Sequence, residues 1–382
     1  MKLTNLKASR YRSLKDVDIS LGSMNVLIGA NASGKSNVLD ALRFLSEGVR
    51  AKDFIESIES RGGCKDLGWR GEGFPIEITL ETTFLDDIGA RYSWTVTLYG
   101  DAMTFSVVEE MFKLNDDNST TKILEFRRGK VWWTSTQARN DRVTLKLHLT
   151  SCALAIACTD ESFPARHVAE FVSRWGFFDP SPPLLRGAAH MTEGDKLDPY
   201  GANLAARLYT IKNAHAGEQT LDRIVTATRH VLGVPEAITL AISPLDGKAY
   251  FSQKEYGGNF AVPQAGISSG TLRMLAFMTA LFGESDSSLV GIEEPENHVH
   301  PSALKGLAEY LREASERVQI IVTTHSPILL DCLPKPEEVS IVRRTPEGTS
   351  ITAEKNPEGV RKALEESGFS LGEFHETKGF GA

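Results

Sequence analysis

The stretch Gly29–Ala30–Asn31–Ala32–Ser33–Gly34–Lys35–Ser36 lies between an apolar run and a segment whose apolar residues recur at helical spacing. It fits the pattern GxxxxGK[ST] at every fixed position. Glycines let backbone N–H groups face a phosphate, and the first turn of a helix adds partial positive charge. The stretch therefore predicts a phosphate-binding loop between a buried strand and a helix.

Specific side chains of this loop are candidates for binding ATP and Mg²⁺. We expect Lys35 to reach the β- and γ-phosphates and the Ser36 hydroxyl to be a ligand of Mg²⁺. Asn31, Gly34 and Asn37 complete the predicted nucleotide contacts.

Two adjacent carboxylates follow an apolar strand that we predict over residues 288–292. We expect Glu293 to hold the Mg²⁺ water shell and Glu294 to polarise the water that attacks the γ-phosphate. The alternative is an ordinary acidic turn.

A second apolar strand, predicted over residues 318–323, runs into Thr324 and His325. His325 is a candidate for a hydrogen bond to the γ-phosphate. A histidine at the end of a strand also occurs for purely structural reasons, so its meaning depends on the other motifs.

The segment from Ser268 to Gly270 opens a helix and predicts a second anion site. A serine before a helix is also a common N-cap. Because the chain has one lysine-bearing phosphate loop, the second site needs a nucleotide that another subunit supplies.

The periodicity of apolar residues divides the chain into three predicted parts. Residues 1–150 hold the phosphate loop and an antiparallel sheet, since apolar residues alternate from Ile76 onward. Residues 151–260 are mainly helical. Residues 261–382 alternate strand and helix, which predicts an α/β fold with a parallel sheet.

The composition limits the class of protein. Among 382 residues the net charge is −8, so binding to nucleic acid would need a local basic patch. No apolar run approaches membrane-spanning length. The four cysteines form no CxxC pair, which favours reduced thiols in the cytoplasm.

In this order, the four motifs resemble the ABC-type ATPase heads of the SMC, RecF and OLD families. The resemblance is greatest to stand-alone bacterial RecF-like ATPases of the AAA-labelled group. Further similar stretches are Tyr11–Arg12–Ser13–Leu14, Thr324–His325–Ser326–Pro327, Leu371–Gly372–Glu373 and residues 379–382.

The resemblance implies a P-loop ATPase head with a mixed central sheet, an antiparallel β-lobe and a helical insertion. It implies hydrolysis of ATP to ADP and phosphate in a head-to-tail homodimer or higher oligomer. Ser268 and Gly270 of one subunit would close on the ATP that Lys35 of the other subunit holds.

Three features depart from the family pattern. Ser269 stands where a glycine is usual, and Glu293 stands where an aspartate is usual. No glutamine occurs between Asn37 and Gln137, so the metal-sensing glutamine loop is not assigned. Arg12 either approaches the nucleotide or is simply exposed to solvent.

A basic stripe over residues 122–146 is the candidate for contact with double-stranded DNA. Its cations are Lys122, Arg127, Arg128, Lys130, Arg139, Arg142 and Lys146, and its aromatic residues are Phe126, Trp132 and Trp133. The alternative is a solvated face of the β-lobe.

His298 and His300 follow the paired carboxylates. They would either link the two nucleotide sites of a dimer or cap a helix starting at Pro301. A metal site of His298, His300 and Glu296 is a third hypothesis.

The predicted function is ATP hydrolysis linked to DNA, in repair or antiviral defence. Because the chain after His325 is too short for a nuclease domain, we expect a separately encoded nuclease or toxin. The alternative is an ATP-gated scaffold that holds and releases a protein partner. A P-loop kinase fits less well, because the Ser268 segment and the paired glutamates have no place in it.

Overall fold

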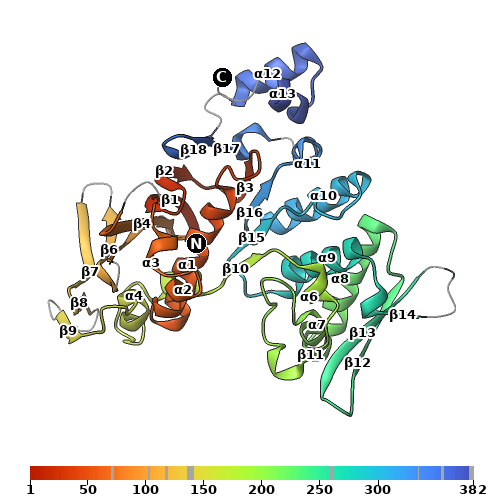
Figure 1. Cartoon of the computed structure of the whole chain (residues 1–382), viewed down its shortest axis with the longest axis horizontal. Helices are drawn as coiled ribbons and strands as arrows, with labels where there is room; N and C mark the ends of the chain where they lie inside the picture. The colour runs from red at the N-terminus through yellow and green to blue at the C-terminus, as the bar shows by residue number, and fades with distance from the viewer. Residues whose placement is uncertain are drawn as a thin grey trace. The chain divides into compact units, whose positions relative to one another are not determined.

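The computed structural model describes residues 1–69, 73–101, 104–116, 119–135, 142–255, 257, 261–333, 335–353 and 357–377 (Figure 1). The chain divides into two compact units. The first comprises Met1–Trp175 and Glu338–Ala353, and the second comprises Gly176–Glu337 and Glu354–Ala382.

The first unit contains an eight-stranded antiparallel sheet in the order β2-β1-β4-β5-β6-β7-β8-β9. Its strands are β1 (Lys2–Tyr11), β2 (Leu14–Ser20), β4 (Ile76–Leu85), β5 (Arg91–Gly100), β6 (Phe105–Asp116), β7 (Ser119–Arg127), β8 (Lys130–Thr134) and β9 (Arg142–Lys146). Alternate residues of β4 and β5 are buried. The predicted antiparallel sheet is therefore confirmed, although its last strand ends at Lys146 and leaves Leu149 half exposed beyond it.

The phosphate loop of the first unit follows β3 (Met24–Ile28), whose five residues are all buried. β3 runs parallel to β17 (Val339–Thr345), and β17 pairs with β18 (Gly348–Ala353) in antiparallel fashion. After the loop, the predicted helix is α1 (Lys35–Ala51). Shorter helices complete the unit: α2 (Ile55–Glu59), α3 (Cys64–Leu67), α4 (Ala153–Ala157) and α5 (Arg166–Ser173).

The second unit holds the two predicted strands that carry acidic residues and histidine. β15 (Leu289–Glu293) runs parallel to β16 (Gln319–Thr324), and the amphipathic helix α10 (Leu304–Ser315) connects them. Helix α9 (Ser269–Met278) precedes β15 and continues into a π-helical turn, η3 (Thr279–Gly283). The carboxyl ends of β15 and β16 therefore lie side by side.

Helices and a small sheet make up the rest of the second unit. The helices are α6 (Pro182–Leu185), α7 (Leu204–Asn213), α8 (Gly217–Leu232), α11 (Pro327–Cys332), α12 (Pro357–Ser367) and α13 (Leu371–Thr377). In the small sheet, the central strand β13 (Lys248–Lys254) pairs with β11 (Ala189–His190), β12 (Ala237–Ile242) and β14 (Ala261–Pro263). In the part of the chain that the structure describes, no helix is both long and apolar enough to cross a membrane.

Candidate active site

The side chain of Lys35 is enclosed by the phosphate loop. Only 4% of Lys35 is exposed, and its Nζ donates hydrogen bonds to the carbonyls of Gly29 (2.7 Å) and Ala30 (3.1 Å). Lys35 is the first residue of α1, so its ammonium lies where the helix N-terminus adds positive charge. The loop thus concentrates positive charge at its centre.

The loop geometry fits a phosphate group. A Cβ at Gly29 would lie 2.0 Å from the carbonyl oxygen of Val342, so only glycine allows this close approach. Gly34 has φ of 110°, a conformation that favours glycine. The Ser33 Oγ is buried and has no hydrogen-bond partner within the described residues. An unsatisfied buried hydroxyl and a glycine-lined loop around an ammonium suit an anion.

A relay of side chains ties the loop to distant parts of the first unit. The Asn37 amide donates to Ser13 Oγ at 2.6 Å, and Thr349 Oγ1 donates to the Ser33 carbonyl at 2.9 Å. Since the Thr349 proton is used in that bond, the 2.7 Å contact between the two hydroxyls has Ser13 as donor. The amide of Asn37, a predicted nucleotide contact, is thus engaged within the protein, whereas Asn31 and Ser36 are exposed.

Arg12 is held by helix α1. Its Nε lies 3.0 Å from Asp40 Oδ2, and the same carboxylate accepts hydrogen bonds from Tyr11 Oη (2.7 Å) and Arg61 Nε (2.9 Å). Burial, followed by the charge of Asp40, raises the pKa of the Tyr11 phenol well above its ordinary value. Arg12 is 31% exposed in its side chain and is part of this cluster, which the sequence did not reveal.

In the second unit, the backbone of Glu294 is fixed from two sides. Its N–H donates to the Thr323 carbonyl at 2.9 Å, and its carbonyl accepts from Arg273 Nη2 at 3.1 Å. Glu294 has a positive φ of 41°, which is rare outside glycine. The Asn297 amide donates to Glu294 Oε2 at 2.8 Å. Glu293, by contrast, ends β15 in register with Thr323 and is half-buried.

The carboxylate of Glu296 organises the end of β16. Its Oε1 accepts hydrogen bonds from Thr324 Oγ1 (2.6 Å) and from the His325 backbone N–H (2.9 Å). His325 Nδ1 lies 3.4 Å from this oxygen and 3.8 Å from Glu294 Oε1. The structure therefore brings His325 and Glu294 together beside Glu296, whose role as a hydrogen-bond acceptor the sequence did not show.

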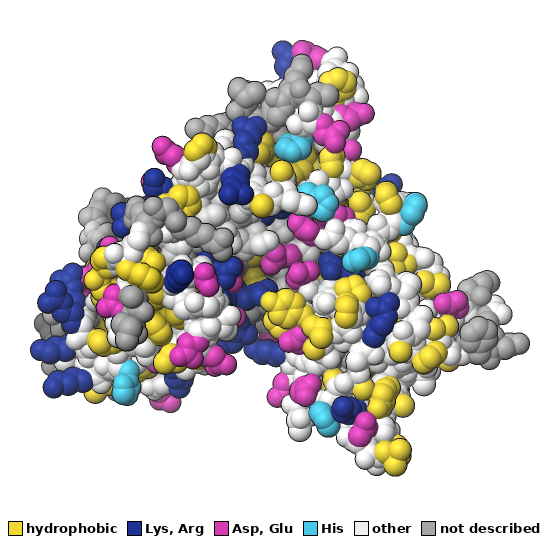
Figure 2. Space-filling view, viewed as in Figure 1, with side chains coloured by type: hydrophobic (Ala, Val, Ile, Leu, Met, Phe, Trp, Pro, Cys, Tyr) yellow, Lys and Arg dark blue, Asp and Glu magenta, His cyan; other side chains and the backbone are white. Residues whose placement is uncertain are grey.

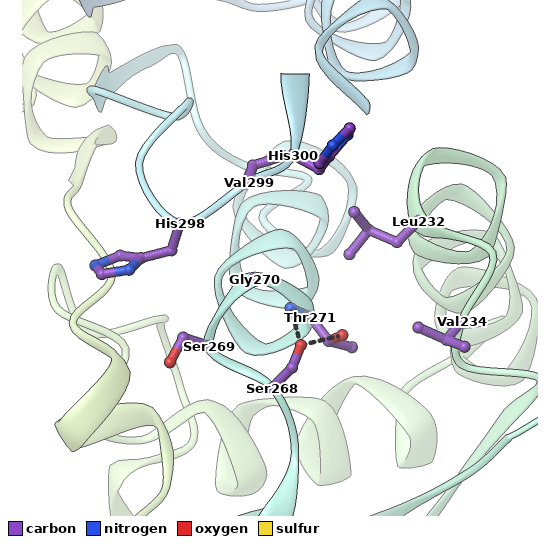
Figure 3. Close-up of a pocket in the computed structure, with 9 residues that line it drawn as sticks. All are labelled: Leu232, Val234, Ser268, Ser269, Gly270, Thr271, His298, Val299 and His300. Carbon is purple, nitrogen blue, oxygen red and sulfur yellow. Dashed lines mark hydrogen bonds between the residues drawn. The ribbon is translucent and has the colours of Figure 1, made fainter. Parts of the chain in front are cut away.

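The Ser268 segment opens helix α9 and lines a pocket of about 460 Å³ (Figure 3). Ser268 is the N-cap: its Oγ accepts from the Thr271 N–H at 3.1 Å. A Cβ at Gly270 would lie 2.6 Å from the His298 carbonyl, so glycine allows the loop after β15 to pass closely. The lining residues are Leu232, Val234, Ser268, Ser269, Gly270, Thr271, His298, Val299 and His300.

The two histidines of this pocket point to opposite sides (Figure 3). His300 Nδ1 accepts from the Ser302 N–H at 3.2 Å and caps the short helix η4 (Pro301–Ala303), as the capping hypothesis predicts. The hypothesis of a metal site with His298, His300 and Glu296 is not supported. Among the residues that the structure describes, no three potential ligands gather closely enough to hold an ion.

Lys and Arg side chains gather over β7, β8 and β9 (Figure 2). Lys122 pairs with Glu125 (3.0 Å) and Arg127 with Glu109 (2.6 Å). Lys130 stands directly opposite both Arg127 and Lys146 in the strand register. Within the described residues, no carboxylate lies within ion-pair distance of Lys130 or Lys146. Arg139 and the side chain of Arg142 lie outside the described residues.

The aromatic residues interleaved in this stripe were expected to be available for stacking on bases, and for two of the three this expectation is wrong. Phe126 is fully buried and Trp133 is 3% exposed, so neither offers a face for stacking on a base. Trp132 is half-buried, and its indole N–H donates to Glu125 Oε2 at 3.0 Å. Alternation with a period of two shows which residues of a strand share a face, but it does not show which face packs on the core.

The fold is that of a P-loop head domain of the ABC type, and it is similar to the head domains of SMC proteins. An SMC head bound to the C-terminal winged-helix domain of ScpA has a TM-score of 0.56 at 14% identity, covering 94% of this chain and 100% of that chain. An SMC head with an extended coiled coil, bound to the C-terminal domain of ScpA derived from Pyrococcus furiosus, has a TM-score of 0.54 at 15% identity, covering 96% and 100%. At such identities the similarity concerns the fold alone.

A family model described as "AAA domain, putative AbiEii toxin, Type IV TA system" matches residues 24–331. This match spans well over half of the chain, and the protein belongs to that family. Among curated proteins, none matches the sequence.

Proposed function

We propose that the protein binds ATP with Mg²⁺ and hydrolyses it to ADP and phosphate. The observation that carries this proposal is the enclosed ammonium of Lys35, held by two carbonyls of its own loop beside the N-terminus of α1. A buried cation at a glycine-lined helix start is suited to the phosphates of a nucleotide. Asn31, Gly34, Ser36 and Asn37 are the further proposed contacts.

The acidic residues of the second unit would act on the attacking water. Glu294 is the proposed base, because Asn297 occupies Oε2 while Oε1 faces His325. His325 is the proposed γ-phosphate contact, since Glu296 fixes its backbone and leaves its ring 40% exposed. Ser36 and Glu293 would hold Mg²⁺, which supplies neutralising charge to the phosphates when bound.

We further propose that two subunits close head to tail on two ATP molecules. Each chain has one lysine-bearing loop and one Ser268 segment, so a second subunit would supply the nucleotide for the latter. Ser268 already caps α9, so its contribution to ATP would come with the N–H groups of the same helix start, including that of Gly270.

Double-stranded DNA is the proposed partner, through Lys122, Arg127, Arg128 and Lys130, in repair or antiviral defence. The opposed lysines at positions 130 and 146 support this, because like charges that face one another are relieved by a bound polyanion. A separately encoded nuclease or toxin would carry out any cleavage.

The test is steady-state ATP hydrolysis with and without duplex DNA, at low and at moderate salt. We expect turnover by the wild type, loss of turnover in Lys35→Met, and no change in Lys212→Met, which removes an exposed lysine from α7. Full activity in Lys35→Met would overturn the proposed site. Stimulation by DNA that fades with salt supports the DNA link, and turnover indifferent to DNA favours the ATP-gated scaffold.

A further inference from the structure

The strand β12 is an open edge of the small sheet in the second unit (Figure 1). Its sequence, Ala-Ile-Thr-Leu-Ala-Ile over residues 237–242, holds no charge, no proline and no glycine. Its one neighbouring strand among the described residues is β13. A free, apolar edge of this length is a template for pairing with another strand.

Four other sheet strands in the described parts of the chain carry protection that β12 lacks. The edge strand β2 contains Lys15, Asp16 and Asp18, and the edge strand β9 contains Lys146. The short strand β14 ends in Pro263. The uncharged strand β18 lies against β2. Charges, prolines and covering elements are the usual means by which edge strands avoid association. Since β12 has none of these among the described residues, its edge is suited to being covered by a strand of another chain.

The outward hydrogen-bonding groups of β12 follow from its register. The Ser243 N–H donates to the Lys248 carbonyl at 2.9 Å, which makes Ser243 an inward-facing residue. Because inward and outward residues alternate along an antiparallel strand, Thr239 and Ala241 also face β13. The backbone groups of Ile238, Leu240 and Ile242 therefore face away from the sheet.

The strand is complementary to itself. In an antiparallel pairing centred on Leu240, Ile238 meets the partner's Ile242, and Thr239 meets the partner's Ala241 (a pair without mutual hydrogen bonds, where side chains come closest). No pair places two charges together. Ile242 is 39% exposed, so the pairing would also cover apolar surface.

We propose that β12 pairs with β12 of a second copy of this chain about a two-fold axis, and so joins two small sheets into one. This contact is isologous and needs no nucleotide, so it is independent of the ATP-driven closure proposed above. An extended segment of a different protein is the competing occupant.

The test measures molar mass by light scattering, without nucleotide, over a concentration series. The wild type should be a dimer. Thr239→Lys with Ala241→Lys places lysine opposite lysine in both symmetry-related pairs and should give a monomer. Thr239→Lys with Ala241→Glu places lysine opposite glutamate and should remain a dimer. Both side chains are exposed, so both double variants should fold alike, which circular dichroism and thermal unfolding check.

A monomeric wild type would overturn the proposal, as would a Lys/Lys variant that stays dimeric. If the Lys/Lys and Lys/Glu variants are both monomeric, the self-pairing register is wrong. Because no nucleotide is present, none of these outcomes depends on whether the ATP site works as proposed.

Discussion

The guanidinium of Arg273 joins helix α9 to the backbone of Glu294. Its Nη2 donates to the Glu294 carbonyl at 3.1 Å, and its Nη1 donates to the Pro180 carbonyl at 2.5 Å. Arg273 is 4% exposed and lies in the first turns of the helix that Ser268 caps. The segment proposed to contact one nucleotide is thus bonded to the residue proposed to act on another.

We expect Arg273→Lys to lower kcat roughly tenfold, since a charged hydrogen bond contributes about 1.5–3 kcal/mol and lysine cannot reach both carbonyls in the same geometry. The matched control is Arg207→Lys. Arg207 bonds the Gly283 carbonyl (2.7 Å) and Glu284 (2.6 Å) in the same unit. Arg207→Lys should lower the free energy of unfolding in urea as much as Arg273→Lys does, but it should keep the wild-type kcat. An equal loss of kcat in both variants would contradict the positioning role of Arg273.

Glu294→Gln should retain ATP binding and lose turnover by about 100-fold or more, the usual contribution of a general base. Glutamine can still accept the Asn297 hydrogen bond but cannot take a proton from water. Light scattering with ATP should then show a long-lived increase in molar mass over that of the nucleotide-free protein. Turnover within about threefold of the wild type would remove Glu294 as the base, since a base contributes far more than that.

Glu296→Ala should lower the free energy of unfolding by about 1–3 kcal/mol, because Thr324 Oγ1 and the His325 N–H lose their acceptor. It should also lower kcat, since His325 is no longer fixed. Glu296→Gln keeps an acceptor oxygen and should restore most of both quantities. Failure of Gln to rescue either quantity would mean that the negative charge, and not the acceptor, is what matters.

Lys130→Gln with Lys146→Gln should weaken binding to duplex DNA and reduce the slope of log affinity against log salt by about 0.9 per lost phosphate contact. Lys146→Gln alone should raise stability by about 0.2–1 kcal/mol, because it removes a like charge directly opposite Lys130. The control Lys212→Gln should change neither quantity. An unchanged salt slope in the double variant would move any DNA contact elsewhere.

Glu110 predicts a pH dependence of stability. Its carboxylate is fully buried and accepts hydrogen bonds from Trp94 Nε1 (2.9 Å) and the N–H groups of Ala153 (2.6 Å) and Leu154 (2.7 Å). Burial outweighs these bonds and raises its pKa from 4.5 to about 7. The folded state therefore holds this proton more tightly than the unfolded state. The contribution of Glu110 to the free energy of unfolding is fully present below pH 4.5 and is lost as pH rises through about 7.

Between pH 5 and 8 the free energy of unfolding of the wild type should thus fall by about 2–3 kcal/mol because of Glu110, whereas that of Glu110→Gln should show no such fall. Urea unfolding of both proteins at several pH values checks this. A difference in stability between the two proteins that does not vary with pH would show that the three hydrogen bonds keep Glu110 ionised throughout.

The sequence predicted what depends on neighbouring residues. Short apolar runs, with the glycine or polar residues that flank them, predict four elements. These are the buried strand before Gly29, the helix starting at Lys35, and the strands ending at Glu293 and Thr324. The order of the motifs, together with these elements, was sufficient to predict the P-loop head fold.

Contacts between distant residues could not be predicted in this way. Ser13 and Thr349 are 336 positions apart, and their bond depends on β18 returning to the phosphate loop. Arg273 and Glu296 likewise act through a neighbouring element, so a single sequence gives no sign of their partners. Burial of Phe126 and Trp133 was missed because alternation alone does not show which face of a sheet is covered.

The hydrogen bond between Thr349 and the phosphate loop can form only late in translation. Ser33 and Lys35 leave the ribosome early, yet the hydroxyl that braces the Ser33 carbonyl belongs to a strand made more than three hundred residues later. A nascent chain therefore carries an incomplete loop through most of translation. The first unit is completed only after residues 176–337 of the second unit have been made. An early stop in synthesis, before Thr349, would therefore leave a chain with every motif but an unbraced phosphate loop.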